Sequence, residues 1–151
     1  MTTNAPFASL CVTAELQNLA VIRRFVEDAM TTLGIDPATI ASTVLAVDEA
    51  ASNIITHGYQ DQSGDIEIDV QHEGNALAIC LRDCAPPFDP TGVPAPDLTV
   101  PLEQRVAGGL GIHLIRQTMD KVIHRITPYG GNELLLIKRL EEGSEALDIC
   151  V

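Results

Sequence analysis

The sequence predicts an α+β domain, a two-layer α/β sandwich in which helices gather on one face of a mostly antiparallel, mixed sheet. Two observations lead to this prediction. Apolar stripes with three- and four-residue spacing occupy the first third of the chain, and strand–turn–strand patterns follow at residues 65–81 and 122–140. The 151 residues suit a single domain, with a core over about residues 7–140 and an acidic tail at 141–151.

Two helices are expected in the first third of the chain. The apolar stripe of the first helix consists of Leu16, Leu19, Ile22, Val26, Ala29 and Leu33. Gly34 can end this helix in a left-handed conformation, and Asp36 followed by Pro37 is a strong start signal for the next one. The second helix is predicted to end near His57, because Gly58 stands where a left-handed residue belongs.

Strands are expected at residues 7–13 and in two hairpins. Over residues 65–71 apolar residues alternate with polar ones, which is typical of a half-buried strand. Turn residues at 73–75 connect it to a second strand that stops at Asp83. The second hairpin is predicted at residues 122–140, around a Gly-rich turn.

The composition excludes several function classes. Nine basic against 21 acidic residues give a formal net charge of −12, which argues against direct binding of nucleic acid. The apolar runs are short and interrupted by charge, so we expect no membrane segment and no secretory signal, and hence a soluble, cytoplasmic protein. Four cysteines without zinc-like spacing are interpreted as buried or loop thiols: Cys11, Cys80, Cys84 and Cys150.

A polar edge on the second helix is the first candidate for chemistry. Glu49, Asn53 and His57 are four residues apart and therefore line one side of that helix. Mg²⁺ prefers oxygen ligands, with phosphate and water completing its shell, and one Asn amide oxygen fits that preference. A carboxylate one turn earlier could polarise water or a hydroxyl. The alternative interpretation is a solvated helix face with an ordinary His near its end.

Asp83 is the second candidate. It ends an apolar strand and precedes residues 84–107, whose six prolines indicate a lid or a binding loop. A carboxylate at this place can accept a hydrogen bond from an exocyclic amine such as that of adenine. The alternative is an Asp that merely starts a turn at a strand end.

A glycine-rich corner is the third candidate. Gly108, Gly109, Leu110 and Gly111 open a helix just after Arg105. The free N–H groups and the positive dipole end of a helix form an anion site, which glycines let a phosphate approach closely. A plain loop-to-helix corner is the alternative.

The order of these features resembles the GHKL (Bergerat) ATPase superfamily and, more narrowly, the anti-sigma-factor serine/threonine kinases, or switch-protein kinases. The resemblance covers about residues 10–140 and implies the Bergerat ATP-binding fold. The segments that carry it are VDEAASNIITHGY (47–59), DCAPPFDP (83–90), GGLGIHLIRQTMDKV (108–122) and GGNELLLIK (130–138).

The resemblance implies ATP and Mg²⁺ as cofactors and a role for each motif. Glu49 would be the general base toward a partner's Ser or Thr hydroxyl, and Asn53 would be the Mg²⁺ ligand. Asp83 would recognise adenine. Gly109 and Gly111 would let the helix start and the lid cover the phosphates.

Two departures from the family pattern bear on nucleotide affinity. Ala85 replaces the Gly of the usual D-x-G motif, so we expect an altered backbone turn beside the base. Many relatives also carry a hydroxyl residue on the final strand, whereas residues 134–137 offer none. Either water takes the place of that hydroxyl, or nucleotide binding is weaker.

The resemblance also implies partners. These are an anti-sigma-factor antagonist as phospho-acceptor, a sigma factor that is sequestered, and a second copy of the chain in a homodimer. Arg23 and Arg24 lie in the region that resembles the family's partner surface, and an acidic protein suits a basic, promoter-reading partner. Two alternatives stay open. One is a nucleotide-gated binding module without phosphate transfer, and the other is the catalytic half of a histidine kinase, for which we expect no room for a phospho-accepting helical hairpin.

Overall fold

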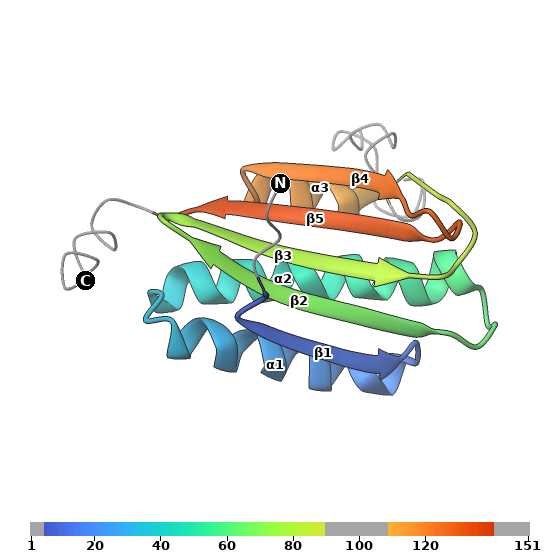
Figure 1. The fold of residues 1–151 in the computed structure, drawn as a ribbon, viewed down its shortest axis with the longest axis horizontal. Coiled ribbons are helices and arrows are strands. Elements are labelled where there is room, and N and C mark those ends of the chain that lie inside the picture. The colour runs from blue at the N-terminus through green and yellow to red at the C-terminus, as the bar shows by residue number, and fades with distance from the viewer. Residues whose placement is uncertain (1–4, 90–108, 141–151) are drawn as a thin grey trace.

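The structure, a computed structural model, describes residues 5–89 and 109–140. Three helices cover one face of a five-stranded sheet (Figure 1). The strands are β1 (Ala8–Thr13), β2 (Asp65–Glu73), β3 (Ala76–Asp83), β4 (Lys121–Ile126) and β5 (Asn132–Arg139). The helices are α1 (Leu19–Thr32), α2 (Pro37–Asn53) and α3 (Gly109–Thr118), with a 3-10 turn at Leu16–Asn18 and a π-helix at Ile54–Tyr59.

The sheet has the order β1-β2-β3-β5-β4, and each neighbouring pair of described strands is antiparallel. The predicted α+β sandwich is confirmed, but the expected mixed character is wrong for these strands, since none of the described pairs is parallel. β3 lies at the centre, and its last residue, Asp83, stands opposite Asn132, the first residue of β5. The register therefore places two polar side chains together at one end of the two central strands.

The core lies between the sheet and the helices, as the apolar patterns predict. Among the fully buried side chains are Ile22, Val26 and Met30 of α1, Val47 of α2, Ile66, Ile68 and Val70 of β2, Leu77, Ile79 and Leu81 of β3, and Leu136 of β5. Gly34 ends α1 with a φ of +78°, as expected. Asp36 caps α2 by accepting a hydrogen bond from the Thr39 N–H at 3.0 Å, and Pro37 is the first helical residue.

The end of the second helix differs from the prediction. Beyond Asn53 the chain continues as a π-helix, and the left-handed residue that ends it is Gln60, with a φ of 50°, rather than Gly58. Gly58 is instead a contact position, because a Cβ there would lie 3.4 Å from the Cβ of Ala85. Gly58 therefore does not mark a left-handed helix end; it faces the segment after β3 at an ordinary contact distance.

Tyr59 joins the end of the π-helix to the sheet. Its hydroxyl donates a hydrogen bond to the carbonyl of Asp65 at 2.7 Å and accepts one from the N–H of Cys84 at 2.8 Å. A Cβ at Gly64 would overlap the Tyr59 ring, so only glycine fits there. One buried phenol therefore ties together the start of β2, the end of β3 and the helix that precedes them.

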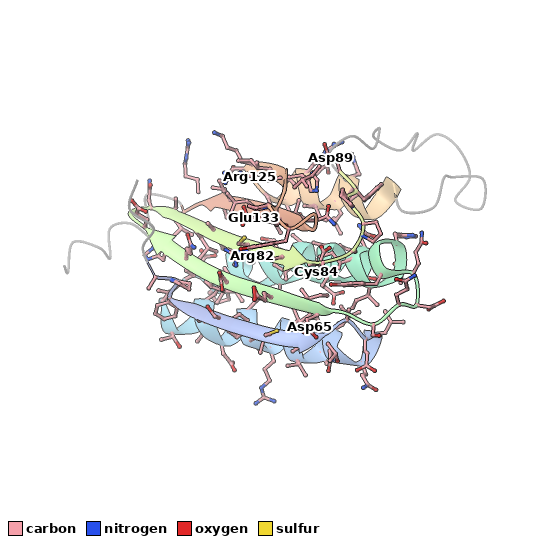
Figure 2. The ribbon with its side chains drawn as sticks, turned by 45° about the vertical axis from the view of Figure 1, so that its right-hand side comes forward. Asp65, Arg82, Cys84, Asp89, Arg125 and Glu133 are labelled. Carbon is pink, nitrogen blue, oxygen red and sulfur yellow. The ribbon has the colours of Figure 1, made fainter. Side chains whose placement is uncertain are left out.

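Ion pairs cross the face of the sheet away from the helices. Arg82 of β3 contacts Asp69 of β2 at 2.7 Å and Glu133 of β5 at 3.0 Å. Arg125 of β4 contacts the other oxygen of Glu133 at 3.6 Å. Figure 2 shows Arg82 and Glu133 side by side on neighbouring strands, with Arg125 beyond them. The charges of four adjacent strands therefore compensate one another locally.

The remaining expectations on composition concern cysteines and membranes. Cys80 is buried, whereas Cys11 and Cys84 are exposed, and all three are free thiols. Cys150 lies outside the described residues. Within residues 5–89 and 109–140, no helix combines the length and the apolar character needed to cross a membrane, and no cluster of His, Cys, Asp and Glu is suited to a metal ion.

Candidate functional site

A pocket opens where the end of α2 and the π-helix meet the ends of the two central strands. Its described lining consists of Ala50, Asn53, Ile54, Gly58, Asp83, Phe88, Ile112, His124, Asn132 and Leu134. Two residues predicted from separate motifs, Asn53 and Asp83, are brought together here although 30 positions separate them in the chain. The walls are mainly apolar, with a few polar groups at defined places, which is typical of small-molecule sites.

Asp83 is the buried acid of this pocket, with only 7% of the residue exposed. Its Oδ1 accepts hydrogen bonds from the Ala85 N–H at 2.9 Å and from Asn132 Nδ2 at 3.0 Å. Burial raises the pKa of this carboxyl above its usual value, although the two donors and the nearby His124 act in the opposite direction. No described residue donates to Oδ2, so one oxygen is left for a ligand that carries a donor.

Asn53 and Glu49 lie one turn apart on α2, and both are half-buried. Asn53 lines the pocket, whereas Glu49 is not among the described residues that line it. The predicted third member of this edge, His57, is exposed and does not belong to the described lining. The reason is the π-helix, whose wider turn places Gly58, five residues after Asn53, toward the pocket instead.

The glycine corner begins α3, as predicted. Gly109, Leu110 and Gly111 form the first residues of this helix, and their surroundings are not described. Arg105 and Gly108 lie outside the described residues. Ile112, which follows directly, lines the pocket. The N-terminal turn of α3 therefore reaches the same cavity as Asn53 and Asp83.

Ala85, which stands where the family pattern has Gly, adopts no left-handed backbone conformation. It is 1% exposed, and its N–H closes the turn onto Asp83 Oδ1 at 2.9 Å. The described non-glycine residues with positive φ are Gln60 and Asp61, so Ala85 does not need the left-handed conformation that favours glycine. The expected change in the turn relative to the family stays a prediction, and what Ala85 adds is a methyl group beside Gly58.

Sequence reasoning missed two residues of the site, Asn132 and His124. Residues 134–137 carry no hydroxyl group, and the polar partner of Asp83 is instead Asn132, at the start of the same strand. His124 of β4 lies 2.8 Å from Asn132 Oδ1 through its Nε2. The turn residues before β5 were a usable signal, because a strand that starts after such a turn places its first side chain at the sheet end.

Arg23 and Arg24, predicted to meet a partner, lie on α1 and are not among the described residues of the pocket lining. Arg23 is already engaged, since it pairs with Asp48 of α2 at 2.7 Å. Arg24 is highly exposed and lies 4.0 Å from Asp28 in the same helix. Both side chains are exposed, Arg24 more than Arg23, and Arg23 also links α1 to α2.

Curated proteins similar to this chain are serine-protein kinases. The chain is 27% identical over 147 residues to serine-protein kinase RsbW of Bacillus subtilis (strain 168), covering 93% of this chain and 89% of that protein. It is 28% identical over 115 residues to serine-protein kinase RsbW of Bacillus cereus (strain AH820), covering 74% of this chain and 72% of that protein. The resemblance indicated by the motifs is confirmed at this level.

Solved structures share the fold. The RsbU and RsbW domains of Rv1364c from Mycobacterium tuberculosis match with a TM-score of 0.60 and 20% identity, over 88% of this chain and 32% of that one. The SiaB-SiaC complex from Pseudomonas aeruginosa contains a chain that matches with a TM-score of 0.57 and 13% identity, over 85% of this chain and 88% of that one. The model of the histidine kinase-like ATPase domain matches residues 12–138, and the chain belongs to this family.

Proposed function

We propose that the protein is a cytoplasmic, ATP- and Mg²⁺-dependent serine/threonine kinase of the anti-sigma-factor type. It would phosphorylate an anti-sigma-factor antagonist, sequester a sigma factor and act as a homodimer. The observation that carries the proposal is the convergence of Asn53, Asp83 and the first turn of α3 on one pocket. The similarity to kinases named RsbW supports the choice of serine or threonine as acceptor.

The chemistry of the pocket fits an adenine base. The Asp83 Oδ2 atom is an acceptor without a described donor, and an exocyclic amine supplies two donors. Apolar side chains of Ile54, Ile112 and Leu134 line the walls, which suits the faces of a flat ring. The base end of a nucleotide would therefore be held by one buried carboxylate and by apolar contacts.

The other end of the site is proposed to hold the triphosphate. Bound ATP with Mg²⁺ would supply an electrophilic phosphoryl group whose charge the metal would partly neutralise. Asn53 offers one amide oxygen to the metal, and the glycines at the start of α3 permit close approach of phosphate to backbone N–H groups. Arg105 and Gly108, just before that helix, are proposed to contribute to the same anion site.

Glu49 is proposed as the general base. It lies one turn before Asn53 on α2, and no described residue donates a hydrogen bond to its carboxylate or pairs with it. An unengaged carboxylate beside the metal ligand can accept the proton of an incoming hydroxyl and orient its oxygen. Since positioning supplies most of the acceleration in phosphoryl transfer, a modest base is sufficient.

Asn53→Ala and Glu49→Gln separate the two roles. We expect Asn53→Ala to lose Mg²⁺-dependent ATP binding, by about 10-fold or more, because the metal loses its protein ligand. Glu49→Gln should retain ATP binding and lose at least about 100-fold in phosphate transfer. Calorimetry with ATP and Mg²⁺ measures the first, and mass spectrometry of the antagonist measures the second.

Ser52→Ala, a neighbouring half-buried position on α2 outside the pocket lining, serves as the matched control and should change neither quantity. Equal nucleotide affinity in the wild type and in Asn53→Ala would contradict the metal role. Full phosphate transfer by Glu49→Gln would contradict the assignment of the base.

The second candidate function is a nucleotide-gated binding module that captures its partner without transferring phosphate. The observation that favours it is Ala85, whose methyl group occupies space beside Gly58 that the family's usual glycine would leave open. Tight complex formation with the antagonist in ATP and Mg²⁺, without an added phosphate in its mass, would support this module over the kinase.

A further inference from the structure

Three polar side chains form a continuous hydrogen-bonded series along one wall of the pocket. His124 Nε2 lies 2.8 Å from Asn132 Oδ1, and Asn132 Nδ2 lies 3.0 Å from Asp83 Oδ1. Asn132 is 7% exposed, and the His124 side chain is 6% exposed. The proposed function uses Asp83 alone, so the other two buried polar groups have no role so far.

The orientation of the Asn132 amide follows from its neighbours. The N–H of Phe88, which can only donate, lies 2.9 Å from one end of the amide, so this end must be the oxygen. The nitrogen then faces acceptors: Asp83 Oδ1 at 3.0 Å and the carbonyls of Pro86 at 3.2 Å and Ala85 at 3.3 Å. Both hydrogens of the amide are therefore used by the protein itself.

The same geometry determines the tautomer of His124. Since Asn132 Oδ1 is an acceptor, His124 Nε2 must carry the hydrogen. Its Nδ1 faces Asp89 Oδ1 at 3.7 Å, and Figure 2 shows Asp89 past the end of β3, on the β4 side. His124 therefore donates to Asn132 whether the ring is neutral or protonated. Among described residues, the charged groups that face this ring are Asp83, through Asn132, and Asp89.

We propose that Asn132 and His124 are the positioning residues that determine which nucleotide base the site accepts. This rests on the proposed nucleotide function. His124 orients the Asn132 amide, and Asn132 in turn holds Asp83 Oδ1. Both hydrogens of the Asn132 amide are then bonded to acceptors of the protein. The polar group that these three side chains leave for the edge of a nucleotide base is the acceptor Asp83 Oδ2. A 6-amino purine donates to such an acceptor, whereas a 6-oxo purine sets oxygen against oxygen.

The test compares the affinities for ATP and for ITP, which differ at position 6 of the base, by calorimetry in the presence of Mg²⁺. Wild type should prefer ATP by about 10- to 100-fold, the value of a hydrogen bond to a charged group. Asn132→Ala should lower this ratio by about 10-fold or more, since Asp83 loses its anchor and an unoccupied space admits other contacts. Tyr129→Ser, at a position that is 96% exposed, should leave the ratio unchanged.

A matched pair at His124 tests the orienting role. His124→Gln retains an N–H donor and should keep most of the ATP preference, whereas His124→Met, of similar size without a donor, should lose it. Nitrogen NMR of the protein without nucleotide should find the neutral ring of His124 protonated at Nε2.

The outcomes are distinguishable. If the wild type binds neither nucleotide, the proposed function fails and the inference fails with it. The inference alone is overturned if ATP binds and its preference over ITP is the same in wild type, Asn132→Ala and His124→Met. A neutral His124 ring that carries its proton on Nδ1 would also overturn it. Far-UV circular dichroism establishes whether each variant is folded. If Asn132→Ala does not fold, the comparison of His124→Gln with His124→Met tests the inference instead.

Discussion

At the end of β3, the Asp83 carboxylate illustrates how one oxygen of a largely buried residue can be left for a ligand. Oδ1 is satisfied by two donors from the protein, whereas Oδ2 has no described donor. A ligand with a donor can therefore pair with an oxygen that the described residues leave open. Burial of the residue raises the pKa of the Asp83 carboxyl above its usual value.

The raised pKa predicts how nucleotide affinity depends on pH. The ionised carboxylate is the acceptor, so affinity should fall about tenfold per pH unit once the pH drops below the pKa of Asp83, which lies above the ordinary value of about 3.9. Calorimetric titration of ATP against pH measures this. The Asp83→Asn variant should bind ATP weakly, and its affinity should not fall in this way at low pH. Its affinity–pH profile also corrects for titration of the nucleotide's phosphates. Identical profiles for both proteins would contradict the assignment.

At the scale of elements, the β4–β5 turn positions the acid of the site from the neighbouring strand. A Cβ at Gly131 would overlap the carbonyl oxygen of Asp83, whereas a Cβ at Gly130 meets nothing within 4 Å. The two adjacent glycines therefore have different functions. Glycine at position 130 allows the left-handed φ of +91°, whereas the missing side chain of Gly131 permits β5 to approach the end of β3.

Gly131→Ala and Gly130→Ala should consequently behave differently. Gly131→Ala must separate the strand ends and should cost about 1–3 kcal/mol of unfolding free energy, together with at least about a tenfold loss of ATP affinity. Gly130→Ala should cost about 1–2 kcal/mol through its left-handed backbone and leave the affinity of the folded protein unchanged. Urea denaturation and calorimetry measure the two quantities. Equal affinities in both variants would show that Gly131 does not position Asp83.

Most elements could be predicted from the sequence because local patterns specify them. The alternation over residues 65–71 gives β2, and Asp36 with Pro37 gives the start of α2. The apolar pattern of the sequence does not reveal the π-helix, because one wider turn changes the spacing of apolar residues too little to be recognised. Asn132 was missed because its partner lies 49 positions away, and only the register of β3 with β5 brings the two together.

The same difference between local patterns and long-range contacts applies to the site residues. Asn53 and Asp83 were predicted because each belongs to a local motif, while their common pocket follows from the arrangement of α2 beside the central strands. Ala85 shows the reverse difficulty. The sequence suggests an effect on the turn, but the position of the Ala85 methyl group beside Gly58 depends on two segments that are distant in the chain.

For the whole molecule, the buried thiol of Cys80 reports on the integrity of the sheet. Burial raises the pKa of this thiol to about 12, so the reactive thiolate is scarce in the folded protein. We expect iodoacetamide at pH 8 to modify the exposed Cys11 and Cys84, and to reach Cys80 only as fast as the molecule unfolds. Peptide mass spectrometry follows each site. Modification of Cys80 at the rate of Cys84 would contradict the burial.

The same thiol contributes to alkaline instability. Its pKa is higher in the folded than in the unfolded chain, so the folded state holds the proton more tightly. Stability should therefore decline as the pH rises from the unfolded pKa of about 8.5 toward 12, and Cys80→Ala should remove that part of the decline. Thermal unfolding scans across this range measure the difference between the two proteins.

The phenol of Tyr59 has a consequence for how the two ends of the pocket keep their spacing. It donates a hydrogen bond to the Asp65 carbonyl at the start of β2 and accepts one from the Cys84 N–H just after Asp83, so it connects the segment that continues from Asn53 to both places. The backbone that follows Asn53 is thus hydrogen-bonded to the residue that follows Asp83. A motion that moves Tyr59 away from Cys84 must break this hydrogen bond, so the phenol restrains the distance between the two sides of the pocket.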